Sequence, residues 1–325
     1  MHFTPKSKTE ISVVIPVYGC KAALPELCSR LNAAITTITE DYEIILVEDH
    51  CPQNSWEAIV TLCKQDSRIK GIRLSRNFGQ ACAIAAGIDE CIGNWVVVMD
   101  CDLQDPPEVI PLLYNKAKEG FDVVFARRNN RKDSKLTLFL SRAYYKTYSY
   151  FVDAKVDPQI GNFSIASRTV IDNFCKMREH SRAYQLFISW LGFNQTYIDI
   201  ESQERHSGKS SYNLRKKLKF ASVLILSHSN KPLILTIRLG LLVAFISVLV
   251  MLALIISKIA GYDYLTGWLS SMVSIYLVGG LLMSSIGISG LYIGNIYTES
   301  KNRPIYVVAE EINIEEEKRN DLFNK

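Results

Sequence analysis

NWVVVMDCDLQDPPE, residues 94–108, carries an apolar segment directly into a cluster of acidic side chains. The apolar segment is short, rich in valine and uncharged, which is typical of a strand buried on both faces of a parallel sheet. Asp100 and Asp102 follow this segment at once. Because ligands bind beyond the carboxyl ends of the strands in open α/β sheets, the stretch predicts a strand that ends in a polar binding site.

Short apolar segments alternate with helical ones from Ile11 to about Asp122, which predicts an α/β fold with a Rossmann-type, mostly parallel sheet. Glu48 and Asp49 end a second predicted strand, so polar side chains gather at one edge of this sheet. The expected strands are residues 11–18, 42–49, 69–75, 94–100, 122–128, 161–168 and 195–202. The expected helices are residues 24–38, 55–65, 80–92, 106–120, 169–179 and 183–193.

The composition excludes some classes of function. The chain has 325 residues, of which 48% are hydrophobic, so a sizeable core can form. The net charge of +4 is too small to indicate nucleic-acid binding, and no nucleic-acid partner is expected. None of the 8 cysteines forms a C-x-x-C pair and no histidine cluster accompanies them, which argues against zinc. The N-terminus lacks a signal peptide, so the cysteines are expected to be small buried hydrophobes in a reducing compartment.

Two long uncharged segments, residues 239–257 and 269–293, follow the α/β region. Each approaches or exceeds the roughly 20 residues that cross a bilayer as a helix. Transmembrane helices are therefore expected at about 236–258 and 268–294, within residues 233–297. Small residues in the second segment suit close helix packing and would permit a homo-oligomer.

Lysine and arginine residues flank this pair of segments, whereas the connection between them carries one lysine at its edge. The positive-inside rule then predicts a multi-pass protein of the inner (cytoplasmic) membrane, with both ends in the cytoplasm. Residues 1–212 are expected to form the cytoplasmic domain, and residues 213–232 a basic amphipathic segment along the inner leaflet. Residues 298–325 are expected to form a charged cytoplasmic tail, of which EEINIEEEKRNDLFNK, residues 310–325, is expected to be solvated or disordered. The predicted spans contain no charge, which argues against transport and favours catalysis at the membrane surface.

The acidic stretch has the composition of a divalent-metal site. Asp102 and Gln104 supply the hard oxygen ligands that suit Mg²⁺ or Mn²⁺, with Asp100 beside them. Such an ion would neutralise a diphosphate and make it a better leaving group. Asp105 and Glu108 flank two prolines, and we expect them to favour the N-terminus of the following helix through its dipole.

Several motifs together resemble one enzyme family: ISVVIPVYG, YEIILVEDHCP, LSRNFGQACAIAAGID, VVVMDCDLQDPPEVIP and RHSGKSSYNLRKKLKFA. With the two terminal spans they are similar to the polyprenyl-phosphate glycosyltransferases, the dolichol-phosphate-mannose-synthase-like branch of the family 2 glycosyltransferases. The likeness extends from residue 11 to about residue 303 and is strongest to bacterial undecaprenyl-phosphate glucosyltransferases. It implies a GT-A-like domain that transfers a sugar, with inversion, from a nucleotide diphosphate, with UDP-glucose favoured, to undecaprenyl or another polyprenyl phosphate. The product would serve O-antigen, lipid A or other cell-envelope modification.

The resemblance also implies roles for individual residues. The implied catalytic residues are Asp100, Asp102 and Arg205, and the implied metal ligands are Asp102 and Gln104. Nucleotide contacts are implied for Pro16, Tyr18, Asp49 and Asp100, and acceptor-phosphate contacts for Arg127, Arg131 and Lys135.

Asn162 departs from the family pattern, since several relatives carry an aspartate there that has been proposed as a base. A phosphate monoester is already anionic at neutral pH and needs no deprotonation, so we leave the base unassigned.

Other functions remain open from the sequence. The same lipid class would accept mannose, an N-acetylhexosamine or an aminoarabinose derivative. A processive polysaccharide synthase is less favoured, because AYQLFISWLGF lacks the arginine of a Q-x-x-R-W stretch and only two spans are present. A non-catalytic sugar-lipid-binding partner of a flippase is argued against by the intact D-x-D-L-Q stretch. A flippase and a downstream glycosyltransferase are expected as partners of an active enzyme.

Overall fold

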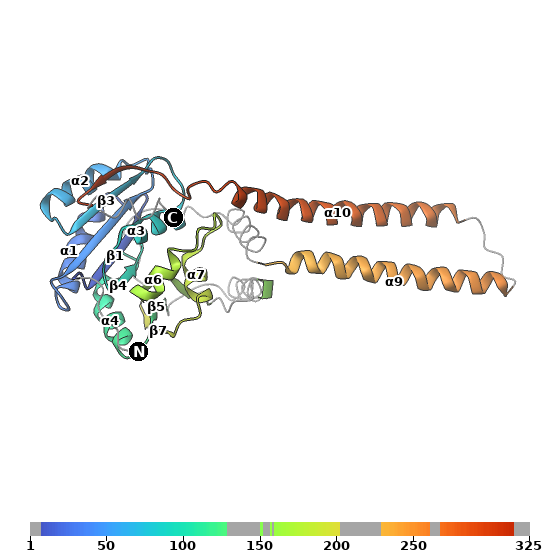
Figure 1. Cartoon of the computed structure of the whole chain (residues 1–325), viewed down its shortest axis with the longest axis horizontal. Helices are drawn as coiled ribbons and strands as arrows, with labels where there is room; N and C mark the ends of the chain where they lie inside the picture. The colour runs from blue at the N-terminus through green and yellow to red at the C-terminus, as the bar shows by residue number, and fades with distance from the viewer. Residues whose placement is uncertain are drawn as a thin grey trace. The chain divides into compact units, whose positions relative to one another are not determined.

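The computed structural model describes residues 8–128, 150–151, 157, 159–201, 229–260 and 267–314. These residues fall into two compact units (Figure 1). One unit contains the strands and shorter helices and includes the segment that begins at Pro304. The other contains two long helices.

The first unit alternates strands and helices at the positions that the sequence predicts. Its elements are β1 (Ile11–Val17), α1 (Leu24–Ile35), β2 (Tyr42–Glu48), α2 (Ser55–Gln65), β3 (Ile69–Leu74), α3 (Gln80–Glu90), β4 (Trp95–Val98), η1 (Pro107–Val109), α4 (Ile110–Lys118), β5 (Val123–Arg128), β6 (Ile160–Ser167), α6 (Arg168–Phe174), α7 (Tyr184–Trp190), β7 (Gln195–Ile200) and β8 (Val308–Ile312).

The strands form one sheet in the order β7-β5-β6-β4-β1-β2-β3-β8. β1 pairs in parallel with both β2 and β4, β2 pairs in parallel with β3, and β5 pairs in parallel with β7. β6 is antiparallel to β4 and β5, and β8 is antiparallel to β3. The predicted mostly parallel sheet is confirmed, and β4 and β5 end at the same edge because both oppose β6.

Apolar side chains pack on both faces of this sheet. Helices lie over these faces (Figure 1). Val13 and Ile15 pack on the side of α1, α2 and α4, whereas Val14 packs on the side of α3, α6 and α7. Gly87 brings α3 against β1, since a Cβ there would collide with the side chain of Val14. The continuous burial of β1 and β2 explains why their sequences are apolar without alternation.

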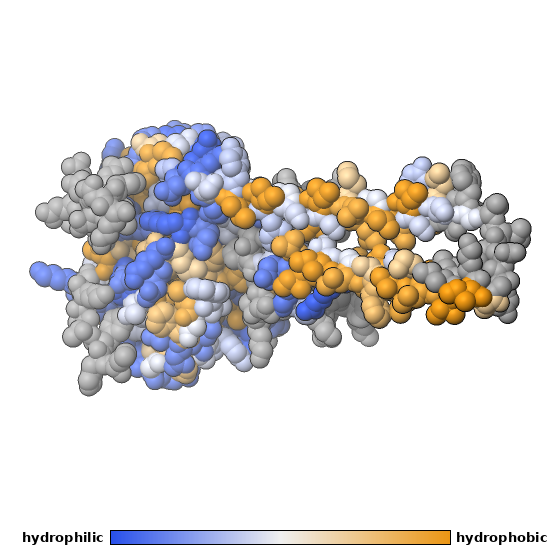
Figure 2. Space-filling view, turned by 45° about the vertical axis from the view of Figure 1, so that its right-hand side comes forward, coloured by the Kyte–Doolittle hydropathy of each residue, from blue (hydrophilic) through white to orange (hydrophobic). Residues whose placement is uncertain are grey.

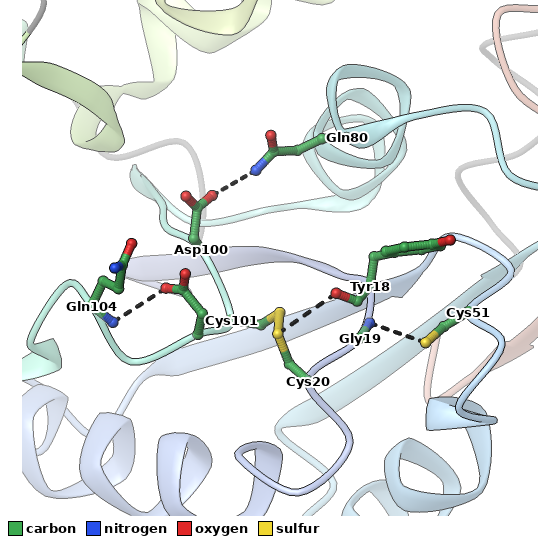
Figure 3. Close-up of a disulfide and its surroundings, with 9 residues drawn as sticks. Tyr18, Gly19, Cys20, Cys51, Gln80, Asp100, Cys101 and Gln104 are labelled. Atoms are coloured by element: carbon green, nitrogen blue, oxygen red, sulfur yellow. Dashed lines mark hydrogen bonds between the residues drawn. A yellow bond between two sulfur atoms is a disulfide. The ribbon is translucent and has the colours of Figure 1, made fainter. Parts of the chain in front are cut away.

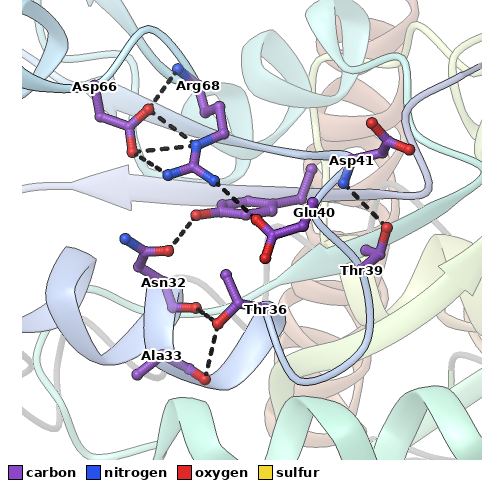
Figure 4. Close-up of polar contacts among 9 residues, drawn as sticks. Asn32, Ala33, Thr36, Thr39, Glu40, Asp41, Asp66 and Arg68 are labelled. Carbon is purple, nitrogen blue, oxygen red and sulfur yellow. Dashed lines mark hydrogen bonds and ion pairs between the residues drawn. The ribbon is translucent and has the colours of Figure 1, made fainter.

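A polar cluster joins the amino ends of β2 and β3 to α1 (Figure 4). The Arg68 guanidinium pairs with Asp66 (Nη2–Oδ2 2.9 Å) and lies 4.6 Å from the centroid of the Tyr42 ring. The Tyr42 hydroxyl donates to Oδ1 of Asn32 on α1. These contacts consolidate the edge of the sheet opposite to the acidic loop after β4.

The segment after the second long helix corrects one expectation. Residues 310–312 were expected in a solvated or disordered tail but belong to β8, which pairs with β3 and near which the dark red segment lies in Figure 1. Val308 packs on one face of the sheet and Ile312 on the other, and Asn313 donates to the backbone carbonyls of Cys63 and Ile69. The apolar side chains between the acidic ones, together with the unpaired edge of β3, explain the strand.

The second unit contains α9 (Lys231–Ile259) and α10 (Trp268–Ser300), close to the predicted spans. Residues 231–253 and 271–300 are long and apolar enough to cross a membrane by length and composition. Apolar side chains are exposed along both helices (Figure 2). The predicted amphipathic segment, residues 213–232, lies outside the described residues up to position 228.

Candidate functional site

The candidate site lies at the carboxyl edge of the sheet, where β1, β2, β3, β4 and β5 end. Figure 3 shows labelled side chains from the ends of β1 and β4, from the start of α3 and from the loop after β2. Five predicted residues occupy this edge: Tyr18, Asp49, Asp100, Asp102 and Gln104. The structure therefore brings together polar residues that are far apart in the sequence.

Asp100 follows β4 and is held by two amide side chains. Nε2 of Gln80 on α3 donates to its Oδ1 at 2.7 Å (Figure 3), and the side chain of Asn162 on β6 also donates to it. Burial, with added repulsion from Asp105 and Asp102, raises the pKa of Asp100 to about 6. Asn162 is thus a neutral hydrogen-bond donor to Asp100.

The loop after Asp100 is tightly turned. Leu103 is 1% exposed and has a φ of 61°, a left-handed conformation that is costly for a branched side chain. This turn lets the backbone N–H of Gln104 donate to Oδ1 of Asp102 at 3.2 Å. A strained turn of this kind is often found where a loop is shaped for ligand binding.

The oxygen atoms of Asp102 and Gln104 fit a divalent cation that is bound chiefly by its substrate. Among the described residues there is no group of three histidine, cysteine or acidic side chains that could hold a metal ion by itself. Mg²⁺ is commonly held by one or two carboxylates together with phosphate oxygens and water. One carboxylate and one amide oxygen on a short loop match that ligand set.

Asp105 has a role different from the expected one at a helix N-terminus. It is 1% exposed, and its carboxylate accepts two hydrogen bonds from Arg128 on β5, from Nε at 2.9 Å and from Nη2 at 2.7 Å. Glu108 instead accepts two hydrogen bonds from Arg30 on α1. The buried Asp105 carboxylate therefore connects the acidic loop to β5, and the exposed Glu108 carboxylate connects it to α1.

Arg127, predicted to contact the acceptor phosphate, faces the other side of β5. Its guanidinium donates to Asp199 on β7 and lies 3.7 Å from the centroid of the Tyr197 ring. Alternation along a strand explains why Arg127 and Arg128 have different partners. The other two predicted acceptor contacts, Arg131 and Lys135, lie outside the described residues, as does Arg205.

Asp49 connects the end of β2 to the start of α3. Its two carboxylate oxygens accept the backbone N–H groups of Phe78 (2.7 Å) and Gly79 (2.9 Å). Burial raises the pKa of Asp49, and these two N–H groups partly offset that rise. Each oxygen retains a lone pair, so Asp49 can still accept a hydrogen bond from a ribose or base.

Pro16 and Tyr18 differ in what they can offer to a nucleotide. Pro16 is buried within β1, opposite Val47 of β2. Tyr18 directly follows β1 and is 51% exposed, so its ring is accessible for stacking. The structure thus favours Tyr18 over Pro16 for direct contact with a ligand.

The sequence did not predict two features of the carboxyl edge of the sheet. Cys20 and Cys101 form a disulfide with a Cα–Cα distance of 6.1 Å, although the sequence predicted separate buried cysteines (Figure 3). The pair is 81 residues apart and has no spacing signature. The second feature is a chain of charges in which Arg73 of β3 contacts both Glu310 of β8 and the buried Glu48 of β2. Only the three-dimensional pairing of strands brings these groups together.

The chain is similar over nearly its whole length to proteins that are named glycosyltransferases. The family model described as Glycosyl transferase family 2 matches residues 12–174. The uncharacterized glycosyltransferase YkcC of Bacillus subtilis is 36% identical over 309 residues, which cover 94% of this chain and 95% of the relative. The bactoprenol glucosyl transferase of Shigella phage SfV is 33% identical over 303 residues, which cover 93% of this chain and 99% of the relative.

Solved structures share the fold at low sequence identity. Mannosyl-3-phosphoglycerate synthase from Rubrobacter xylanophilus has a TM-score of 0.50 at 15% identity, covering 67% of this chain and 73% of that one. Glucosyl-3-phosphoglycerate synthase from Mycobacterium tuberculosis also has a TM-score of 0.50 at 15% identity, covering 69% of this chain and 81% of that one. These likenesses confirm the GT-A-like architecture of the sheet unit.

Proposed function

Because the chain belongs to glycosyl transferase family 2, we propose that it transfers a sugar from a nucleotide diphosphate to a polyprenyl phosphate at the cytoplasmic face of a membrane. The chain is a glycosyltransferase by its family. The observation that carries the proposal is the acidic loop from Asp100 to Gln104, which follows β4 at the carboxyl edge of a GT-A-like sheet. The relatives named bactoprenol glucosyl transferase support a polyprenyl acceptor and glucose as the sugar.

The donor we propose is UDP-glucose. The exposed ring of Tyr18 stacks on the base, and the carboxylate of Asp49 accepts a hydrogen bond from the ribose or base. Asp102 and Gln104 are the residues that would hold Mg²⁺ or Mn²⁺. The bound ion supplies charge neutralisation to the departing nucleotide diphosphate.

The acceptor reacts through an oxygen of its phosphate monoester, which attacks the anomeric carbon and expels the nucleotide diphosphate. This oxygen is already anionic, so no side chain has to remove a proton. The presence of a neutral amide at Asn162 is consistent with such a reaction. The protein then has to align the two reactants and to surround them with positively charged groups. Arg131, Lys135 and Arg205 remain the proposed phosphate contacts. Arg127 would have to leave Asp199 to join them.

The sheet itself supports the proposed topology of the chain. β8 follows α10 in sequence and pairs with β3, which precedes α9. Strands that pair lie on the same side of a membrane, so an even number of crossings separates them. A hairpin of two spanning helices meets this requirement. The flanking basic residues support the cytoplasm as that side. We propose that the lipid-linked sugar serves cell-envelope modification, such as that of O-antigen.

The test is to incubate the purified protein in lipid vesicles that contain undecaprenyl phosphate with a panel of labelled nucleotide sugars and a divalent cation. We expect one glycosylated lipid of the mass of glucosyl-undecaprenyl phosphate. Asp102→Asn should abolish transfer while the protein still folds, whereas Asp172→Asn on the surface of α6 should leave it unchanged. A fully active Asp102→Asn variant would refute the assignment of Asp102, and the absence of any lipid product would refute the acceptor.

A further inference from the structure

We propose that Cys20 and Cys101 form a reversible oxidation site, and that their disulfide weakens the binding of a metal–nucleotide complex at the donor loop. The covalent part of this proposal stands on the geometry of the two cysteines alone. Its effect on binding rests on the proposed function of the loop as a donor site.

The two cysteines lie at the centre of the candidate site. Cys101 stands between Asp100 and Asp102 and is 5% exposed. Cys20 is partly exposed on the loop after β1, two residues beyond Tyr18 (Figure 3). Their Cα–Cα distance of 6.1 Å lies in the usual range for a disulfide. The bond therefore ties the acidic loop to the loop that carries the proposed base-stacking ring.

The location of the pair suggests a transient bond. Cytosolic disulfides in mesophiles are usually catalytic or redox-sensing, because thiol reductants keep structural thiols reduced. This pair joins two proposed ligand-binding loops: Cys101 belongs to the apolar cluster on one face of the sheet, and the partly exposed Cys20 packs against that cluster. A bond in such a place changes the shape of the site when it forms or breaks.

The oxidant we propose is a hydroperoxide such as hydrogen peroxide. The sulfur of the accessible Cys20 attacks the O–O bond, which yields a sulfenic acid at Cys20 and one molecule of water. The Cys101 thiol then attacks the Cys20 sulfur, forms the S–S bond and releases a second molecule of water. Two thiols lose two electrons and two protons in total, and the peroxide is reduced to two molecules of water. A dithiol reductant reverses the reaction by thiol–disulfide exchange.

The disulfide-bonded structure shows how the bond would act on the donor loop. Asp100 is held by Gln80, and the Asp102 carboxylate accepts the backbone N–H of Gln104 within its own loop. The side-chain oxygens of Asp102 and Gln104 would bind one ion together, so how closely they coordinate it depends on small adjustments of the loop around Cys101. The S–S bond restricts those adjustments, and disturbing the groups that orient metal ligands typically costs roughly 10- to 100-fold in affinity. We expect a loss of about tenfold.

The experiment uses the full-length protein in detergent, with the cysteines reduced by dithiothreitol or oxidised by hydrogen peroxide. Alkylation followed by peptide mass measurement reports the bond directly, and calorimetric titration with UDP and Mn²⁺ reports binding. We expect peroxide to protect Cys20 and Cys101 from alkylation, to weaken UDP binding about tenfold, and dithiothreitol to restore both. Cys20→Ser is the preferred variant because Cys20 is partly exposed, whereas the burial of Cys101 makes its replacement more disruptive.

Cys20→Ser should bind UDP equally with and without peroxide. Cys175→Ser, at a partly exposed cysteine after α6 that forms no disulfide, should respond to peroxide like the wild type. Two thiols that stay alkylatable after peroxide treatment would overturn the oxidation site. A reversible bond with unchanged UDP binding would overturn its effect on the loop while leaving the proposed function intact. If the reduced protein binds no nucleotide diphosphate, the proposed function fails and the effect on binding fails with it, although the mass measurement still reports the bond.

Discussion

Asp105 and Arg128 form a two-point ion pair that joins the acidic loop after β4 to the end of β5, with the Asp105 carboxylate almost completely buried. The neighbouring Arg127 forms a pair of the same geometry with Asp199, but that carboxylate is 42% exposed. The two pairs thus differ mainly in burial, and they permit a matched comparison.

We expect Asp105→Asn to lower the free energy of unfolding by about 3 kcal/mol, because removing one partner of a buried pair leaves the other charge uncompensated. Asp199→Asn should have little measurable effect, since exposed pairs contribute little. Denaturant titration of both variants in detergent measures the difference. Equal losses in the two variants would show that burial of Asp105 does not govern the strength of its pair.

Asp100→Asn should stabilise the protein at neutral pH while it lowers sugar transfer. Burial raises the pKa of Asp100 to about 6, above the value of about 3.9 in an unfolded chain. Ionisation of Asp100 therefore opposes folding, and the wild type loses stability as the pH rises from about 4 through 6. Because asparagine does not ionise, the variant does not undergo this loss, and it should gain about 3 kcal/mol at pH 7.5 and nothing below pH 4.

Thermal unfolding of the metal-free protein across this pH range measures the gain from Asp100→Asn. Asp172→Asn, on the surface of α6, is the control and should show no such trend. A gain that persists at pH 4 would mean that the substitution acts through packing and not through charge.

Arg68→Ala tests the polar cluster at the opposite edge of the sheet. The hydrogen bonds from Arg68 hold the pKa of Asp66 below its usual value. A carboxylate with a lowered pKa contributes stability above its unfolded pKa and loses that contribution as the pH falls through its folded pKa. We expect the variant to be about 1 kcal/mol less stable at pH 7.

The difference between Arg68→Ala and the wild type should narrow below about pH 4, where Asp66 becomes protonated. Its sugar transfer should match that of the wild type, because the cluster lies at the amino ends of the strands. A loss of transfer without a loss of stability would contradict the separation between the two edges.

A chain that ends at Arg303 should lose stability, whereas a chain that ends at Ile314 should not. The shorter chain lacks β8 and with it the packing of Val308 and Ile312, which we expect to cost about 3 kcal/mol. The melting temperature should fall by roughly 10 °C, and the exposed edge of β3 should become sensitive to protease. If the two truncated proteins have the same melting temperature, the edge strand β8 contributes nothing to the stability of the sheet.

The sequence predicted most of the fold because the information was local. The bounds of α2 match its predicted range, and the seven strands from β1 to β7 appear at the expected positions. β8 was not predicted, because its apolar side chains are few and lie among acidic residues, and its partner β3 is distant in the chain.

The candidate site was predictable in position but not in detail. The acidic loop follows from a buried strand that ends in carboxylates. Which of Arg127 and Arg128 pairs with that loop depends on the phase of alternation along β5, which the sequence does not reveal. The meeting of Cys20 with Cys101 depends on the strand order, because β1 and β4 are neighbours in the sheet but not in the chain.

The pairing of β8 with β3 also sets an order of events during synthesis of the protein. The ribosome completes β3 early, but residues 308–312 emerge only after both long helices have been made. The outer edge of β3 therefore stays without its β8 partner while more than two-thirds of the chain is synthesised. The nascent domain has to tolerate an open edge until both long helices have been made, and a chain that ends before residue 308 leaves that edge open.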